Sequence, residues 1–90
     1  MYKIIRTDSF VKKANKFLKK HPDLQNKLEN IINLLTVNPF DSSLKTHKLK
    51  GNMKEFYSCS LDYKFRIILS IIVVENKVYL IDIGSHDEVY

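Results

Sequence analysis

The segment Phe65-Arg66-Ile67-Ile68-Leu69-Ser70-Ile71-Ile72-Val73-Val74 decides the fold. It is rich in β-branched residues with few polar interruptions, which predicts a long central strand that is covered on at least one face. Shorter strand patterns precede it at residues 55–61 and follow it at residues 77–83, and turn-forming residues separate them at 62–64 and 75–76. We therefore expect three consecutive strands in the second half of the chain.

The first half of the chain has a strand pattern followed by two helix patterns. Residues 2–6 alternate loosely, and Thr7-Asp8-Ser9 then supplies three good N-cap residues. Apolar residues next recur at helical spacing from about residue 10 to 20 and from about 22 to 37. The proline of His21-Pro22 disfavours the helical region for the residue before it and is accepted in a first helical turn, so it divides the two helices. The apolar stripes consist of Phe10, Ala14, Phe17 and Leu18 in the first helix and Leu24, Leu28, Ile31, Ile32 and Leu35 in the second.

The predicted order is β-α-α-β-β-β, an α+β layer structure with the helices on one face of a small sheet. Ninety residues leave room for one domain, residues 1–90. The segment 40–54 is expected to connect the second helix to the second strand. Leu44, Leu49 and Met53 would anchor this segment to the core, and its lysines would point outward.

The charge of the chain suggests a polyanionic partner. Lys and Arg number 15 against 10 Asp and Glu, which gives a net charge of +5 and a pI of about 9.4. Nucleic acid, acidic proteins or an anionic membrane would be attracted to such a surface, although lysines also simply keep small proteins soluble. Cys59 is the only cysteine, so an internal disulfide framework and a multi-cysteine metal site are excluded. A buried, inert thiol is expected there.

Targeting signals are not recognisable in the sequence. The first residues lack a signal-peptide pattern, and the longest apolar run is shorter than the roughly 20 residues that a membrane-spanning helix needs. We therefore expect a cytoplasmic protein.

None of the common catalytic signatures occurs in the chain. It has no phosphate-binding glycine loop, no paired histidines at metal-ligand spacing and no nucleophile elbow. His21, His47 and His86 fall in three separate loops or ends, a pattern that does not support a zinc site.

Basic and aromatic residues offer better candidates for a site. The stretch 45–51 alternates cations around His47 and could follow a phosphate backbone, or it could be a solvated loop. Arg66 interrupts an apolar strand, so it either faces solvent or lines a concave anion site. His86 and Tyr90 follow the last strand, and this tail either frays or turns back over the sheet toward Arg66 and the 45–54 segment.

Three motifs together resemble the RelE/ParE superfamily of toxin–antitoxin toxins. They are His47-Lys48-Leu49-Lys50-Gly51, the segment Asp62-Tyr63-Lys64-Phe65-Arg66-Ile67-Ile68 and the ending Gly84-Ser85-His86-Asp87-Glu88-Val89-Tyr90. The element order agrees, the likeness spans nearly the whole chain, and the ending is most similar to the YafQ branch. This resemblance implies a small, mostly antiparallel four-stranded sheet with a helical hairpin packed on one face.

The resemblance also implies an activity and partners. The superfamily's mRNA interferases cut messenger RNA in the ribosomal A site without a metal or another cofactor, by attack of a 2′-hydroxyl on the adjacent phosphate. Such chemistry needs a base, an acid and cations near the developing charge. The implied partners are mRNA, ribosomal RNA and a cognate antitoxin in a hetero-oligomeric complex, and no membrane is implied.

The positions that match the family's motifs give expected roles. His86 is expected to be the main acid/base group, with His47 assisting it or contacting phosphate. Tyr90 would stack on a base or contact phosphate, and Arg66 would lie near the phosphate. The expected RNA-binding cations are Lys45, Lys48, Lys50, Lys54 and Lys64.

The sequence also departs from the YafQ branch. Ser60 and Lys64 stand where that branch carries a histidine and an aspartate, so the proton-transfer set is incomplete. Two other functions stay open: a ParE-like toxin that poisons DNA gyrase without ribonuclease activity, and a degenerate family member that retains only antitoxin binding. The histidine-bearing tail favours the ribonuclease, because a pure binder has no need of proton-transfer groups.

Overall fold

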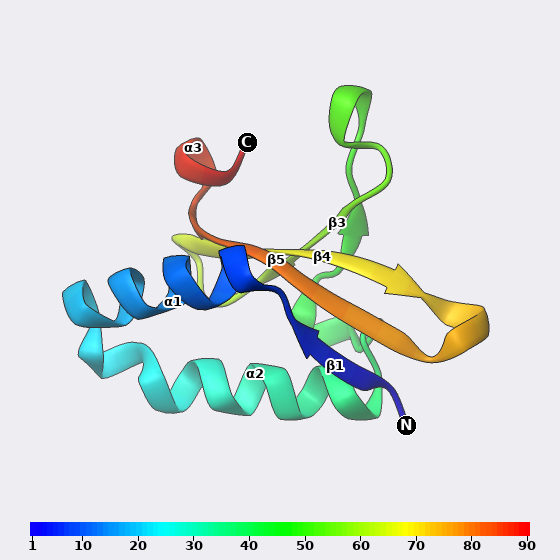
Figure 1. Ribbon diagram of the computed structural model, residues 1–90, viewed down its shortest axis with the longest axis horizontal. Coiled ribbons are helices and arrows are strands. Elements are labelled where there is room, and N and C mark those ends of the chain that lie inside the picture. Colours follow the sequence, from blue (N-terminus) through cyan, green and yellow to red (C-terminus); the bar gives the residue numbers. More distant parts are fainter.

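The computed structural model describes residues 1–90 as a five-stranded sheet with two long helices on one face (Figure 1). The strand order is β1-β5-β4-β3-β2. The strands are β1 (Lys3–Arg6), β2 (His47–Lys48), β3 (Tyr57–Ser60), β4 (Phe65–Ile72) and β5 (Lys77–Ser85). Only the β1–β5 pairing is parallel, and the other three pairings are antiparallel. The predicted α+β class with a mostly antiparallel sheet is therefore confirmed.

The predicted strand count was wrong by one, because the segment before β3 contributes β2. His47 pairs with Ser58 and Lys48 with Tyr57. Two residues are too few to produce an alternating pattern in a sequence, so pairing with β3, and not local preference, makes this strand. The expectation that three residues anchor the segment 40–54 to the core is only partly confirmed. Leu44 is fully buried in the core, whereas Leu49 and Met53 are half-buried and lie outside it.

The helices begin and end where local chemistry favours it. α1 (Asp8–Lys20) starts at Thr7, whose Oγ1 accepts a hydrogen bond from the Phe10 N–H at 3.2 Å and donates one to the Leu80 carbonyl at 2.6 Å. The N-cap therefore also ties the helix to β5. α2 (Gln25–Val37) follows a single 3₁₀ turn at Pro22–Leu24, which explains how two antiparallel helices are joined so tightly.

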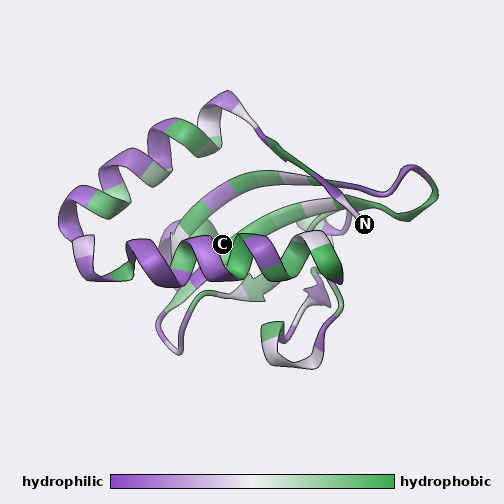
Figure 2. Cartoon of the chain, turned by 90° about the horizontal axis from the view of Figure 1, so that it is seen from below, coloured by the Kyte–Doolittle hydropathy of each residue, from purple (hydrophilic) through white to green (hydrophobic).

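The core lies between this helical hairpin and one face of the sheet. Phe10 and Phe17 of α1 and Leu35 of α2 meet the inward side chains of the strands. Along β4 these inward residues are Phe65, Ile67, Leu69 and Ile71, as a period of two requires. Figure 2 shows the same pattern, with apolar strands and with helices banded by hydrophobic and hydrophilic residues.

The opposite face of the sheet carries two projections. β5 runs to Ser85, two residues beyond its predicted end, and leads into the short helix α3 (His86–Val89). The chain from His47 through a 3₁₀ turn at Gly51–Met53 to β3 forms an arm, defined here as residues 47–56, that rises beside α3 (Figure 1). The tail thus turns back over the sheet.

No helix in the structure has the length and apolar character needed to cross a membrane.

Candidate functional site

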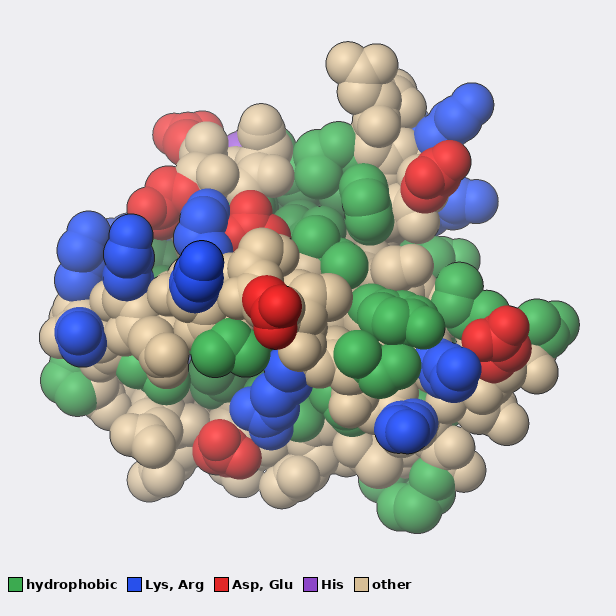
Figure 3. All heavy atoms as spheres, viewed as in Figure 1, with side chains coloured by type: hydrophobic (Ala, Val, Ile, Leu, Met, Phe, Trp, Pro, Cys, Tyr) green, Lys and Arg blue, Asp and Glu red, His purple; other side chains and the backbone are tan.

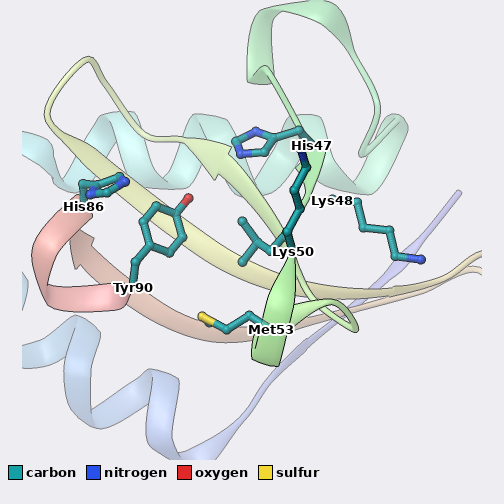
Figure 4. Close-up of a pocket in the computed structure, with 7 residues that line it drawn as sticks. His47, Lys48, Lys50, Met53, His86 and Tyr90 are labelled. Atoms are coloured by element: carbon teal, nitrogen blue, oxygen red, sulfur yellow. The ribbon is translucent and has the colours of Figure 1, made fainter.

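A pocket of about 480 Å³ opens between α3 and the arm. We call it the histidine pocket, and it is lined by His47, Lys48, Leu49, Lys50, Met53, His86 and Tyr90. Figure 4 shows the two histidines on opposite sides, with the Tyr90 phenol pointing into the space between them. The space-filling view shows the same hollow beside α3, with hydrophobic side chains at its floor (Figure 3).

α3 is held at the end of β5 by a capping box. The Glu88 Oε1 accepts the Ser85 N–H at 2.8 Å, and the Ser85 side chain accepts from the Glu88 backbone. Hydrogen bonds from the Ser85 backbone and hydroxyl lower the pKa of the Glu88 carboxyl. Gly84 lets the helix sit close to the strand, because a Cβ there would lie 3.1 Å from Glu88 Cβ. Val89 is buried and fixes the helix to the sheet.

Tyr90 connects His86 to the floor of the sheet. The two rings are in edge-to-face contact, with centroids 4.4 Å apart and an interplanar angle of 79°. The phenol hydroxyl donates a hydrogen bond to Oγ of Ser58, which is fully buried. The His86 side chain itself is 70% exposed, with Nδ1 3.5 Å from Oδ1 of Asp87. An accessible imidazole is thus held against an anchored aromatic ring.

His47 faces the same pocket because of its strand register. It pairs with Ser58, and both project from the side of the sheet opposite the helices. Its Nδ1 lies 3.1 Å from the Lys45 carbonyl oxygen, a contact that helps to set the ring orientation. Lys48 alternates to the other side of β2, so its side chain extends away from the histidines (Figure 4).

Four of the expected site residues lie outside the histidine pocket. Arg66 is on the same face of the sheet, but it donates a hydrogen bond to the Ser60 hydroxyl and lines a different hollow together with Lys45. Lys54 and Lys64 line neither cavity. The Lys64 ammonium lies 5.4 Å from the Phe65 ring centroid. The structure therefore brings together His47, His86 and Tyr90 with Lys50, and it separates them from Arg66, Lys45, Lys54 and Lys64. Lys48 also lines the pocket, but its side chain extends away from the histidines.

A family model for the YafQ bacterial toxin of type II toxin–antitoxin systems matches residues 2–90. The chain belongs to the YafQ family. None of the curated proteins is detectably similar to it.

Solved structures agree with this family. A metal-bound toxin from Helicobacter pylori is 30% identical over 100% of both chains, with a TM-score of 0.82. YafQ from E. coli strain BL21(DE3) is 21% identical over 100% of this chain and 99% of its own, with a TM-score of 0.83. YafQ in the E. coli DinJ–YafQ complex is also 21% identical over the same shares, with a TM-score of 0.82. The E. coli structures share the fold of this YafQ-family chain.

The metal-bound relative raises the question whether this chain could hold a metal in the same way. No three His, Cys, Asp or Glu side chains are grouped closely enough to bind a metal ion. His21 lies between Phe17 and Phe65, with ring centroids 4.8 and 4.7 Å away, and is not near the other two histidines. Cys59 is buried, and desolvation raises the pKa of its thiol to about 12. The residues of this chain therefore do not fit a site with three such ligands.

Three residues that shape the histidine pocket, Ser58, Ser85 and Glu88, were not predicted from the sequence. Ser85-x-x-Glu88 is a capping-box pattern and could have indicated the start of α3. Ser58 carried no usable signal, because its role depends on a partner 32 residues away.

Proposed function

We propose that this YafQ-family toxin is a ribosome-dependent endoribonuclease that cleaves mRNA at the histidine pocket. The observation that carries the proposal is the convergence of His47, His86 and Tyr90 on one open pocket. These three come from an arm and a tail that are far apart in the sequence. Two imidazoles beside an RNA strand are suited to proton transfer near neutral pH.

In the proposed reaction the RNA supplies its own nucleophile. A base takes the proton of the 2′-hydroxyl, the oxygen attacks the adjacent phosphorus, and the bond from phosphorus to the 5′-oxygen breaks. An acid then gives a proton to that leaving oxygen. The products are a 2′,3′-cyclic phosphate and a free 5′-hydroxyl, and nearby cations stabilise the negative charge that develops on the phosphate.

His86 is proposed as the main acid/base group. Its exposure allows it to reach a bound strand, and the Tyr90 ring limits its orientation. His47 on the facing wall would assist or contact phosphate, with Lys50 adding charge beside it. Because the Tyr90 hydroxyl already donates to Ser58, stacking of a base on its ring is the role that its contacts support best.

We further propose an acidic antitoxin as the protein partner. Solved structures contain an E. coli toxin–antitoxin complex of DinJ and YafQ. In this chain α1 carries Lys12, Lys13, Lys16, Lys19 and Lys20. Figure 3 shows Lys and Arg side chains gathered over this helix. An acidic segment would be attracted to such a surface, and its association should slow as salt rises.

Primer extension on a reporter mRNA after induction of the chain tests the proposed activity. Cleavage within translated codons is expected, and co-expression of the cognate antitoxin should abolish it. Intact mRNA together with blocked DNA replication would instead indicate a gyrase-poisoning toxin. Intact mRNA with normal growth would indicate a degenerate toxin, and either result would overturn the ribonuclease assignment.

A further inference from the structure

A second hollow of about 410 Å³ lies at the edge of the sheet, next to β2 and β3. We call it the edge hollow. Its polar lining consists of Lys27, Ser43, Lys45, Ser60, Tyr63 and Arg66, together with Asp62. These residues come from α2, from the loop before β2, and from the β3–β4 hairpin, so the tertiary fold and not one local motif assembles it.

The edge hollow has a net positive lining, with three cations against the single carboxylate of Asp62. Lys27, Lys45 and Arg66 form no salt bridge with any carboxylate. The one carboxylate in the lining, Asp62, has its Oδ1 committed to the backbone N–H groups of Lys64 and Phe65 at 2.9 and 2.8 Å. Arg66 has a neutral partner, the Ser60 hydroxyl. Three cations and two serine hydroxyls around one concavity suit a phosphate group.

The same stretch of backbone separates the edge hollow from the histidine pocket. Lys45 lines the edge hollow and His47 lines the histidine pocket, and the Lys45 carbonyl touches the His47 ring at 3.1 Å. Lys45 adopts a left-handed backbone conformation with φ of 53°, which is uncommon for a lysine and sets the direction of the chain there. The two cavities therefore lie on either side of one short stretch of backbone, residues 45–47, and an RNA strand that follows this stretch would meet both.

We infer that the edge hollow binds an RNA phosphate next to the one that undergoes cleavage in the histidine pocket. The inference rests on the proposed function and gives Arg66 a different task from the one its sequence position suggested. Together with Lys27 and Lys45, Arg66 would bind the RNA strand at a neighbouring phosphate and would not contact the reacting atoms. Tyr63, which is 93% exposed at the rim, offers a ring on which the adjoining base can stack.

Binding of uncleavable RNA over a salt series tests this site. The probes are a dinucleotide, which has one internal phosphate, and a hexanucleotide, both 2′-O-methylated and read by fluorescence anisotropy from low to moderate salt. The variants are Lys27→Gln and Lys45→Gln. Lys3→Gln is the matched control, because it removes the same charge from an exposed lysine on β1, at the opposite edge of the sheet.

The logarithm of the association constant falls as the logarithm of the salt concentration rises. Loss of one phosphate contact should make this slope less steep by about 0.7 for single-stranded RNA. We expect this reduction for Lys27→Gln and Lys45→Gln with the hexanucleotide and not with the dinucleotide, while Lys3→Gln behaves as the unmodified chain with both. If all three variants bound the hexanucleotide with the same salt dependence as the unmodified chain, the edge site would be overturned. Failure of the unmodified chain to bind the hexanucleotide at low salt would overturn it too. In either case, cleavage seen by primer extension would leave the proposed ribonuclease standing.

Discussion

The hydroxyl of Tyr90 donates a hydrogen bond to Ser58, which lies on β3 and is separated from it by 32 residues in the chain. The Tyr90 ring simultaneously contacts His86 edge-to-face. Through these two contacts the tail is fixed to a fully buried position in the sheet. The placement of His86 therefore depends on Ser58, a buried residue that cannot itself contact RNA.

Tyr90→Phe should destabilise the fold while leaving much of the pocket intact. The variant keeps the ring against His86 but leaves the buried Ser58 hydroxyl without its partner, which costs about 1–3 kcal/mol. Urea denaturation would measure this loss, and Ser58→Ala added to Tyr90→Phe should recover part of it. Tyr63→Phe is the control, because Tyr63 is 93% exposed. Additive effects of Tyr90→Phe and Ser58→Ala would show that the two hydroxyls are not coupled.

His86→Gln should reduce mRNA cleavage without unfolding the protein. General acid–base catalysis contributes about 10²- to 10⁴-fold, so a loss of that size is expected in the rate of cleavage on ribosomes. The side chain is 70% exposed, and its replacement should change the free energy of unfolding little. Undiminished cleavage would remove His86 from the reaction.

His21 provides the matched comparison for that experiment. Its ring packs at a tilt against Phe17 and Phe65 and lies outside the histidine pocket. We expect His21→Gln to lower stability and to leave the cleavage rate of the folded protein nearly unchanged. If His86→Gln and His21→Gln reduced the cleavage rate equally, the loss could not be assigned to the histidine pocket.

The sequence predicted those parts of the fold that depend on local periodicity. The helical stripes that include Phe10, Phe17 and Leu35, and the long strand that begins at Phe65, are found within a few residues of their expected limits. β2 was missed because only pairing with β3 creates it, and β4 stops at Ile72 because a 3₁₀ turn at Val73–Glu75 precedes Asn76. Such features depend on long-range contacts, which periodicity does not encode.

The candidate site was predictable in composition but not in grouping. His47, His86 and Tyr90 carry the family resemblance, and the structure places all three around one pocket. Arg66 was expected near the phosphate from the same resemblance, and alternation along β4 does place it on the same face of the sheet as His47. Its side chain instead extends toward Ser60 and the sheet edge, a choice of direction that strand alternation alone does not determine.

Cys59 should be unreactive in the folded protein and should make it less stable in alkali. Burial raises the pKa of its thiol to about 12 from an ordinary value of 9.0. Above pH 9 the unfolded chain releases this proton while the folded chain keeps it, so the contribution is constant below about pH 9 and is lost as pH rises toward 12. Labelling with a thiol reagent at pH 8 should be slow without urea and fast in urea. Cys59→Ala should remove the thiol's share of the alkaline loss, and rapid labelling of the folded protein would contradict the prediction.

Glu88 should control activity through the geometry of α3. Glu88→Ala removes the acceptor for the Ser85 N–H and should loosen the four-residue helix that carries His86, with a few-fold loss of cleavage. Glu88→Gln keeps a side-chain oxygen at that position and is expected to retain most of the activity. Equal losses in both variants would mean that the charge matters more than the cap, for example through the attraction of Lys20 and Lys13.

The pH dependence of the capping box separates it from the chemistry of the histidines. Hydrogen bonds from Ser85 lower the pKa of Glu88 below its ordinary value of 4.5, so ionised Glu88 stabilises the folded state above pH 4.5. This stabilisation is lost as pH falls through the lowered pKa, and it is constant between pH 5 and 8. A change of cleavage rate within that range must therefore come from other groups. The amide proton shift of Ser85, followed by NMR, should titrate with a midpoint below 4.5, and a midpoint at or above 4.5 would show that the cap does not prefer the carboxylate.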